Sequence, residues 1–398
     1  MIFACKTHTP TGSPKVSGMK VLVDCTPLAW GGGVQGAIAL LVNLRQQSDI
    51  DWQAVVPIPL QSFLPPEVAF DARVFFVQKR HNFDRVWLRY KLPHIEAAFA
   101  PDIVFTVSGP AYFRARAYHV VGFALPTLIY KPDGPLTSPT LLGKLTDWLR
   151  CIALRQADHF AVQTQVVADR LARRLQIDPD RISVIGNCVN PLLAQHSPGE
   201  DPPIGCFGIL IPTAYYLHKN LEITPPVAAA MRRLDPELDF EFRFTLEPSS
   251  PHWRAIAAEA KRLGIADRLV AVGTLRLNEL ALAYRAASAV FLPTLREAST
   301  AVYPESFFFE RPLVTSDMDF ARELCGDAAI FVPPQDVDQI AARLIELARS
   351  AELRSRLITA GRRQLPRAYP SSSEKFKLQV ELLHRVIATR NIDARRQR

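Results

Sequence analysis

The regular alternation of short apolar runs with longer amphipathic stretches restricts the fold of this chain more than any other feature of its sequence. The short runs are rich in β-branched and aromatic residues, and the stretches between them have helical spacing. Strands joined by helical crossovers form parallel sheets covered by helices. A first series of expected strands covers Val21–Val23, Trp52–Val56, Val74–Val77, Ile103–Val107, His119–Phe123, His159–Gln163 and Ile182–Ile185, and a second covers Ile204–Ile209, Phe240–Phe244, Leu269–Val272, Ala289–Leu292, Pro312–Thr315 and Ala329–Val332.

The two series predict an α/β protein with two Rossmann-like domains, each a doubly wound parallel sheet, that face each other across a cleft. A polar segment rich in Pro and Gly separates the series and is typical of a linker. Near the end of the chain, Leu382, Leu383 and Val386 recur at helical spacing. The expected segments are a disordered leader at 1–18, an N-terminal domain at 19–196, a linker at 197–203, a C-terminal domain at 204–368, a helix at 371–388 that crosses back to the first domain, and a basic, frayed tail at 390–398.

Composition excludes several classes of protein. With 48% hydrophobic and 22% charged residues the chain can bury a core, which excludes wholesale disorder. The six cysteines form no C-x-x-C pair, and we expect reduced thiols in a cytoplasmic protein. No apolar run approaches the roughly 18 residues that a membrane span needs. The net charge of +8 is compatible with nucleic acid, an anionic membrane or phosphorylated substrates, and does not choose among them.

Two glutamates follow the expected strand Ala289–Leu292. Glu297 lies in the loop after this strand, and Glu305 lies in the first turn of a helix that we expect to begin near Pro304. Open α/β sheets bind ligands at the carboxyl ends of their strands. Loop and helix amides at this edge suit a phosphate, and carboxylates suit sugar or ribose hydroxyls. Alternatively, Glu305 is an ordinary acid that complements the helix dipole.

A cation follows the expected strand Ile204–Ile209 at the same sheet edge. His218, Lys219 and Asn220 lie in the loop before the next expected helix. In this position Lys219 can neutralise a diphosphate. Taken in isolation, the triplet also fits a solvated turn.

Glycines cluster after the first expected strand. Gly31, Gly33 and Gly36 match the spelling G-x-G-x-x-G. The segment from Asp24 to Trp30 is too long for the tight turn that dinucleotide binding needs. We therefore expect a flexible loop at the cleft, where a ligand phosphate or sugar can approach the backbone closely. A permissive surface loop is the alternative interpretation.

Taken in order, these motifs resemble the retaining nucleotide-sugar glycosyltransferases of the GT-B fold, in particular those of family 4. Glu297 and Glu305 match the E-x7-E motif of that family, and the likeness extends in order over about residues 19–386. The other matching passages are Asp158–Thr164, Arg181–Asn187, Leu269–Gly273, Glu279–Ala287, Pro312–Ser316, Phe320–Ala329 and Pro333–Asp336.

The resemblance implies a nucleotide diphospho-sugar donor held mainly by the second domain. Glu297 would bind the donor hexose, and Glu305 would bind the ribose hydroxyls. Lys219, with His218 and Asn220 beside it, would contact the diphosphate. Catalysis would rest on Glu297 and Lys219, without a metal or another cofactor. Backbone amides that would close around sugar and phosphate belong to Ser299, Thr300, Ala301, Val302, Gly31, Gly32 and Gly33.

The chain departs from the family pattern at several places. The usual E-G-F-G run reads Glu297-Ala298-Ser299-Thr300, and the usual Arg before the lysine is missing from 211–217. These departures motivate an alternative, a catalytically silent relative that binds nucleotide or glycan as a partner subunit, but the presence of Glu297, Glu305 and Lys219 together argues against it. A nicotinamide enzyme that uses the glycines, or a nucleotide-sugar epimerase, is a third class.

A basic helix in the first domain is the candidate face for acceptor or membrane. Residues 79–91 carry five cations against one acid, with apolar and aromatic residues at i, i+3, i+4 and i+7. This helix can rest on an anionic leaflet or meet a lipid-linked glycan, or it can dock its aromatic stripe, including Tyr90, into the core. No nucleic-acid recognition motif accompanies it. The residues assigned to this face are Arg85, Trp87, Arg89 and Lys91.

The resemblance also implies the reaction. A hexose or deoxyhexose, with mannosyl as the first choice, would pass with retention to a saccharide or lipid-linked saccharide. Transfer would occur on one face of the sugar, and the leaving diphosphate would accept the proton of the acceptor. The setting would be surface polysaccharide synthesis in the cytoplasm, with peripheral contact to the inner membrane and no nucleic-acid partner.

Overall fold

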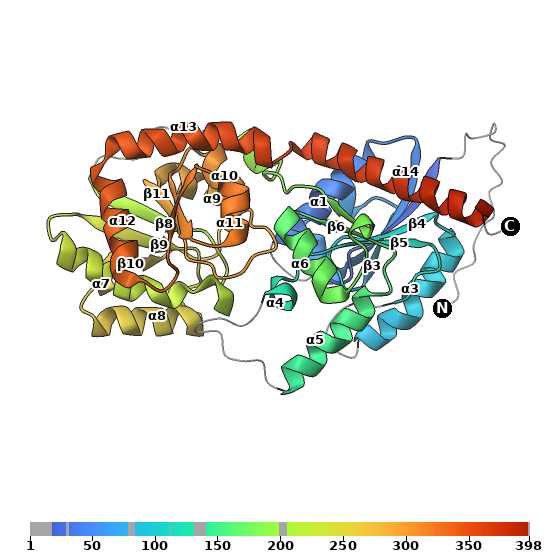
Figure 1. Cartoon of the computed structure of the whole chain (residues 1–398), viewed down its shortest axis with the longest axis horizontal. Coiled ribbons are helices and arrows are strands. Elements are labelled where there is room, and N and C mark those ends of the chain that lie inside the picture. Colours follow the sequence, from blue (N-terminus) through green and yellow to red (C-terminus); the bar gives the residue numbers. More distant parts are fainter. Residues whose placement is uncertain are drawn as a thin grey trace.

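The computed structural model describes residues 18–28, 32–78, 84–111, 113–130, 141–198 and 205–396, so most of the expected leader and linker lies outside the description. Two parallel sheets lie side by side (Figure 1), which confirms the expected pair of Rossmann-like domains. Within these described ranges the first sheet has seven strands and the second has six. The strands are β1 (Met19–Asp24), β2 (Ile50–Pro57), β3 (Val74–Val77), β4 (Ile103–Thr106), β5 (Tyr118–Gly122), β6 (His159–Val162), β7 (Ile182–Val184), β8 (Phe207–Ile211), β9 (Phe240–Phe244), β10 (Leu269–Ala271), β11 (Ala289–Leu292), β12 (Leu313–Ser316) and β13 (Ala329–Val332).

Helices cover both sheets (Figure 1), because each crossover between parallel strands runs over a face of the sheet. Their buried faces follow the helical period: in α6, Val167, Leu171 and Leu175 are buried. The helices are α1 (Gly32–Arg45), α2 (Pro66–Ala69), α3 (Asp84–Phe99), α4 (Pro126–Ile129), α5 (Leu141–Leu154), α6 (Gln165–Leu175), α7 (Thr224–Leu234), α8 (Pro251–Arg262), α9 (Leu277–Ala286), α10 (Val302–Phe308), α11 (Asp319–Cys325), α12 (Val337–Arg349), α13 (Ala351–Ala368) and α14 (Ser372–Arg396).

The strand predictions agree with the structure to within a residue or two, with one correction. The eighth strand is Phe207–Ile211 and not 204–209, because the buried apolar run continues further along the chain. Gly205 precedes this strand with a φ of 139°, a conformation that favours glycine. The helix of the second glutamate begins at Val302, so Pro304 is its third residue. Proline is tolerated there because the first turn of a helix needs no N–H donor.

Each sheet reverses its strand order at one point, between β1 and β4 in the first sheet and between β8 and β11 in the second. Loops that leave these strands run to opposite faces and open a crevice, which is where open sheets bind ligands. In the second sheet Ile209 of β8 pairs in parallel with Ala289 of β11. The loops 212–220 and 293–301 therefore begin at the same sheet edge.

The last helix, α14, crosses from the second domain to the first, as expected. Figure 1 shows α13 and α14 along one side of the molecule, with α14 lying over the first domain. Its residues Phe376, Leu382, Leu383 and Val386 are buried in the same hydrophobic cluster as side chains of β1 and β2. The helix continues to Arg396, so its backbone includes most of the segment that we expected to be a frayed tail.

The two domains also contact each other between α6 and α11. Glu323 of α11 accepts hydrogen bonds from the backbone N–H groups of Gln165 (2.6 Å) and Val166 (2.8 Å), at the start of α6. Nearby, Arg170 of α6 forms an ion pair with Asp319 of α11. The second domain thus supplies charged partners to the first turns of a helix in the other domain.

Candidate active site

The loops after β8 and β11 bring Lys219 and Glu297 together. The Lys219 ammonium donates to Glu297 Oε1, and the two residues are only 7% and 5% exposed. The hydroxyl of Thr294 donates to the same carboxylate oxygen at 2.9 Å. A buried ion pair needs such additional hydrogen bonds to offset the loss of water. The two residues that the sequence assigned to catalysis are therefore in contact at the switch point of the second sheet.

The neighbours of Lys219 hold its loop in place. Asn220 has a φ of 54°, and its side-chain amide donates to the carbonyl of Pro334 at 3.0 Å. His218 stacks on Tyr216, with ring centroids 5.4 Å apart. Burial lowers the pKa of His218 to about 4, so its ring is neutral near pH 7. His218 can therefore offer a hydrogen bond to a ligand at neutral pH, but not a positive charge.

Glu305 lies in the first turn of α10, as expected, and is 6% exposed. The hydroxyl of Tyr284, from α9, donates to Glu305 Oε2 at 2.8 Å. Burial raises the pKa of Glu305 to about 7, and the hydrogen bond from Tyr284 acts in the opposite direction. Glu305 therefore changes its charge near neutral pH.

The loop between the two glutamates contains the expected amide donors. The hydroxyl of Ser299, in this loop, is buried and has no hydrogen-bond partner among the described residues. The hydroxyl of Thr300 accepts from the backbone N–H of Val302 at 3.3 Å and shapes the turn into α10. A buried hydroxyl without a partner is a group that a ligand can satisfy.

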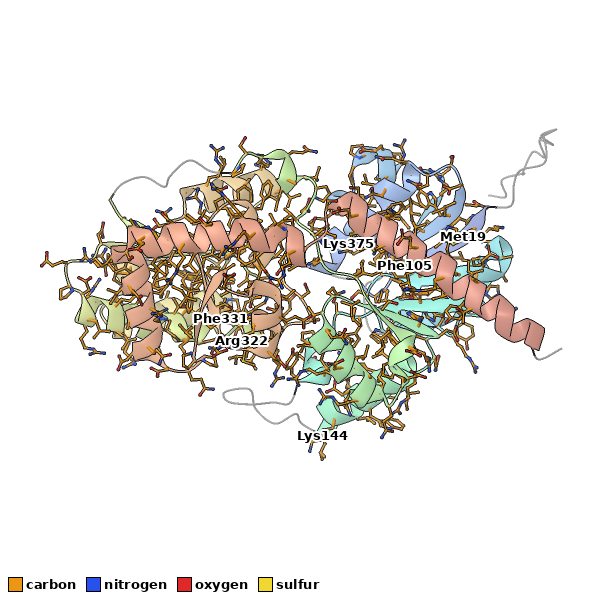
Figure 2. All side chains as sticks on the ribbon, turned by 45° about the horizontal axis from the view of Figure 1, so that its top comes forward. Met19, Phe105, Lys144, Arg322, Phe331 and Lys375 are labelled. Carbon is orange, nitrogen blue, oxygen red and sulfur yellow. The ribbon has the colours of Figure 1, made fainter. Side chains whose placement is uncertain are left out.

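A small pocket lies between the domains beside Glu305. Ala301 and Glu305 line it from the second domain, and Gln35 and Gly36 of α1 line it from the first. Lys375 of α14 is also among the residues that line the pocket, and Figure 2 shows this lysine near the start of the crossing helix. Burial lowers the pKa of Lys375. A lysine of the crossing helix therefore lines the same cavity as Glu305.

The expected glycine loop is in part a helix. Gly31 lies outside the described residues, but Gly32 and Gly33 are the first two residues of α1, so the prediction of a flexible loop was wrong for them. The helix starts this early because Val34 is already buried in the core. A Cβ on Gly33 would come within 2.7 Å of the Leu28 side chain. A larger residue at 33 would therefore need the end of the Leu28 side chain to shift.

The basic helix is α3, and its core-facing residues differ from the expected stripe. Leu88 and Leu92 are fully buried, whereas Tyr90 is 69% exposed, so the aromatic stripe does not enter the core at Tyr90. The reason is that Leu88 and Leu92, one turn apart, already fill the contact. Lys91 is exposed. The side chains of Arg85, Trp87 and Arg89 lie outside the description.

Asp317 and Asp319, spelled D-x-D in the sequence, serve structural contacts. Asp317 pairs with Arg322, and Asp319 pairs with Arg170. Within the described ranges, no group of three or more His, Cys, Asp or Glu side chains is arranged to hold a metal ion.

The sequence did not indicate three neighbours of the candidate site. Tyr284 lies in a passage that matched the family, yet its pairing with Glu305 depends on how α9 packs on α10. Thr294 and Lys375 carry no local signal at all, because each reaches the site through tertiary contacts. All three are visible only once the sheet edge is assembled.

Sequence models of two families match the chain. The model described as Glycosyltransferase Family 4 matches residues 31–191, and the model described as Glycosyl transferases group 1 matches residues 216–350. One match falls in each domain, and together they cover about three quarters of the chain. No curated protein sequence matches the chain.

Solved structures have the same fold. A glycosyltransferase from Rickettsia africae ESF-5 gives a TM-score of 0.69 at 15% identity, over 92% of this chain and 97% of that one. Sucrose-phosphate synthase from Thermosynechococcus elongatus gives a TM-score of 0.70 at 14% identity, over 93% of this chain and 100% of that one. HepE from Anabaena, in complex with UDP and glucose, gives a TM-score of 0.71 at 14% identity, over 92% of this chain and 99% of that one. With a family match in each domain and the GT-B fold throughout, the chain belongs to the family 4, group 1 glycosyltransferases.

Proposed function

We propose that this glycosyltransferase moves a hexose or deoxyhexose, with retention, from a nucleoside diphosphate sugar to a saccharide or lipid-linked saccharide in surface polysaccharide synthesis. One observation carries the proposal: Lys219 and Glu297 form a buried pair at the switch point, with Glu305 at the start of α10. A cation suits a diphosphate, and carboxylates suit the hydroxyls of a sugar and a ribose. The complex of HepE with UDP and glucose supports this class of donor, and mannosyl transfer is the first reaction to test.

The proposed chemistry depends on position and charge. The bond between the anomeric carbon and the diphosphate oxygen breaks, and the acceptor oxygen bonds to the same face of that carbon. The acceptor proton passes to the leaving diphosphate oxygen. Lys219 would neutralise the charge that develops on this oxygen, and Glu297 would hold hydroxyls of the hexose. We propose that the transfer needs no metal and that the Lys219 ammonium is the cation that faces the diphosphate.

The test is thermal shift of the full chain against UDP, GDP, ADP, dTDP and NAD, each with and without EDTA. We expect one nucleoside diphosphate to raise the melting temperature of the wild type, but not that of Glu305→Ala, with no effect of EDTA. The same nucleotide, linked to hexoses, is then assayed for transfer. The proposal would be contradicted if NAD alone stabilised the protein, or if none of the nucleoside diphosphates did. Loss of the shift in EDTA would contradict the metal-independent mechanism.

A further inference from the structure

The first domain carries a helix whose apolar side chains face the solvent. In α5, Leu141 is 86% exposed and Trp148 is 56% exposed, although apolar residues of this size normally lie in a core. Such a concentration of exposed apolar side chains on one element marks an interaction surface. The exposed apolar residues of this helix are Leu141, Leu142, Leu145, Trp148, Leu149 and Ile152.

These side chains share one face of the helix. At about 100° per residue they fall within an arc of roughly 120°, from Trp148 to Leu142. The residues that attach α5 to the domain, Cys151 and Leu154, are buried and lie on a different arc. The outward stripe is therefore separate from the face that packs on the core. We define it as the α5 stripe.

Cations flank the α5 stripe. On the helical projection Lys144 lies beside one edge and Arg150 lies beyond the other. The single acid of the helix, Asp147, pairs with Arg150 at 3.0 Å, and Arg155 follows the last turn. Two copies of this helix packed face to face would bring like charges together, and the chain as a whole carries +8. An anionic lipid surface matches both the apolar stripe and its basic margins.

Among the described residues, the position of α5 leaves this face open. Figure 1 shows α5 on the opposite side of the molecule from α13 and α14, and in Figure 2 Lys144 lies at the outer edge. No helix in the described part of the chain has the length and apolar composition to cross a bilayer. An amphipathic helix with Leu and Trp on one face and Lys and Arg beside it lies in the plane of the lipid headgroups.

We propose that the α5 stripe docks the enzyme on an anionic lipid bilayer, with Leu141, Leu145 and Trp148 inserted among the headgroups. The sequence alone assigned the membrane face to residues 85–91 of α3, and the proposal moves it to α5. Docking requires neither donor nor acceptor, so it stands or falls separately from the proposed transfer. A docked α5 would hold the first domain at the surface where a lipid-linked acceptor resides.

The test is co-sedimentation of the full chain with vesicles. One set contains equal parts of phosphatidylcholine and phosphatidylglycerol, and the other contains phosphatidylcholine alone. We expect the wild type to bind the anionic vesicles, more weakly as salt rises, and to bind the neutral vesicles at least about tenfold more weakly. Leu145→Glu with Trp148→Glu should weaken binding to the anionic vesicles by about tenfold or more, because two acids replace two inserted apolar groups.

The matched control is Phe63→Glu with Phe70→Glu, a double change at exposed aromatic positions elsewhere in the first domain. It should bind as the wild type does, and both variants should keep the wild-type melting temperature because all four positions are exposed. Equal loss in both variants, or no vesicle binding by the wild type at low salt, would overturn the proposal. So would light scattering that shows a wild-type dimer and a monomer for the α5 variant, since the stripe would then join two copies.

Discussion

The hydroxyl of Tyr284 donates a 2.8 Å hydrogen bond to Glu305, and this is the polar contact that supports a carboxyl buried at the domain boundary. Glu305 also lines the small pocket between the domains. Because burial raises the pKa of Glu305 to about 7, its charge responds to small changes of pH around neutrality.

Nucleotide affinity should therefore depend on pH. As pH rises through about 7, Glu305 loses its proton and becomes a stronger acceptor for ribose hydroxyls. We expect the dissociation constant of the preferred nucleoside diphosphate to fall several-fold between pH 6 and pH 8. Titration calorimetry at both pH values measures the effect. Glu305→Gln is the control and should bind weakly with no such pH dependence; an unchanged dependence in Glu305→Gln would assign the titration to another group.

Stability should change with pH in the opposite direction. The pKa of Glu305 is about 7 in the folded chain and about 4.3 when unfolded, so between these values the folded state binds more protons. Stability from this group is therefore lost as pH rises through that window and levels off above it. Glu305→Gln should be more stable than the wild type at pH 8, by an amount on the order of 3 kcal/mol, and should lose this advantage near pH 4. Denaturant unfolding at the two pH values measures the difference.

The ion pair of Lys219 and Glu297 is tested first by a substitution of the lysine and then by a second substitution at the glutamate. Lys219→Met should lower the transfer rate about a hundredfold, because it removes the cation that we propose stabilises the leaving diphosphate. It should also destabilise the fold by about 3–5 kcal/mol, since Glu297 is left buried and unpaired. Adding Glu297→Gln should restore much of the stability but not the activity. If the double variant regains transfer, the pair is structural and the assignment of Lys219 to the diphosphate is wrong.

The strands could be predicted from the sequence because buried parallel strands are continuous apolar runs, and Phe240–Phe244 and Ala289–Leu292 have the predicted bounds. The contact between Lys219 and Glu297 could also be anticipated, because their loops follow β8 and β11, which are parallel neighbours and end at the same sheet edge. The faces of helices are harder to predict. A helical period shows that α5 has an apolar side, but only the packing of Cys151 shows that this side points outward. For the same reason, the helical period of α3 did not show that Tyr90 is exposed.

The contact between the domains can be loosened selectively. Glu323→Gln removes the negative charge that faces the N-terminus of α6 while keeping the side-chain shape, and we expect a cost of about 1 kcal/mol. Hydrogen exchange should become faster at the amides of Gln165 and Val166. Glu352→Gln, at an exposed acid in the first turn of α13, is the control and should leave these amides unchanged. Wild-type protection in Glu323→Gln would show that the carboxylate does not hold α6.

The attachment of α14 is tested at its buried face. Phe376→Ala should cost about 3–5 kcal/mol, because it opens a cavity in the cluster that contains β1 and β2. Leu378→Ala, two residues further on and 42% exposed, should cost little. Hydrogen exchange of β1 and β2 amides shows whether the loss falls in the first domain. Equal and small effects of both changes would mean that α14 contributes little to that core.

The position of α14 in the chain has a consequence for biosynthesis. The N-terminal domain is translated first, yet part of its core comes from Phe376, Leu382 and Val386, which follow the second domain in the chain. Domains that are complete in sequence can fold while the ribosome is still elongating. This one leaves the apolar surface of α1 and β5 against which α14 packs exposed until the whole second domain has been made. The first domain therefore completes its core only after the second domain has been made, and a premature stop within the second domain leaves both domains incomplete.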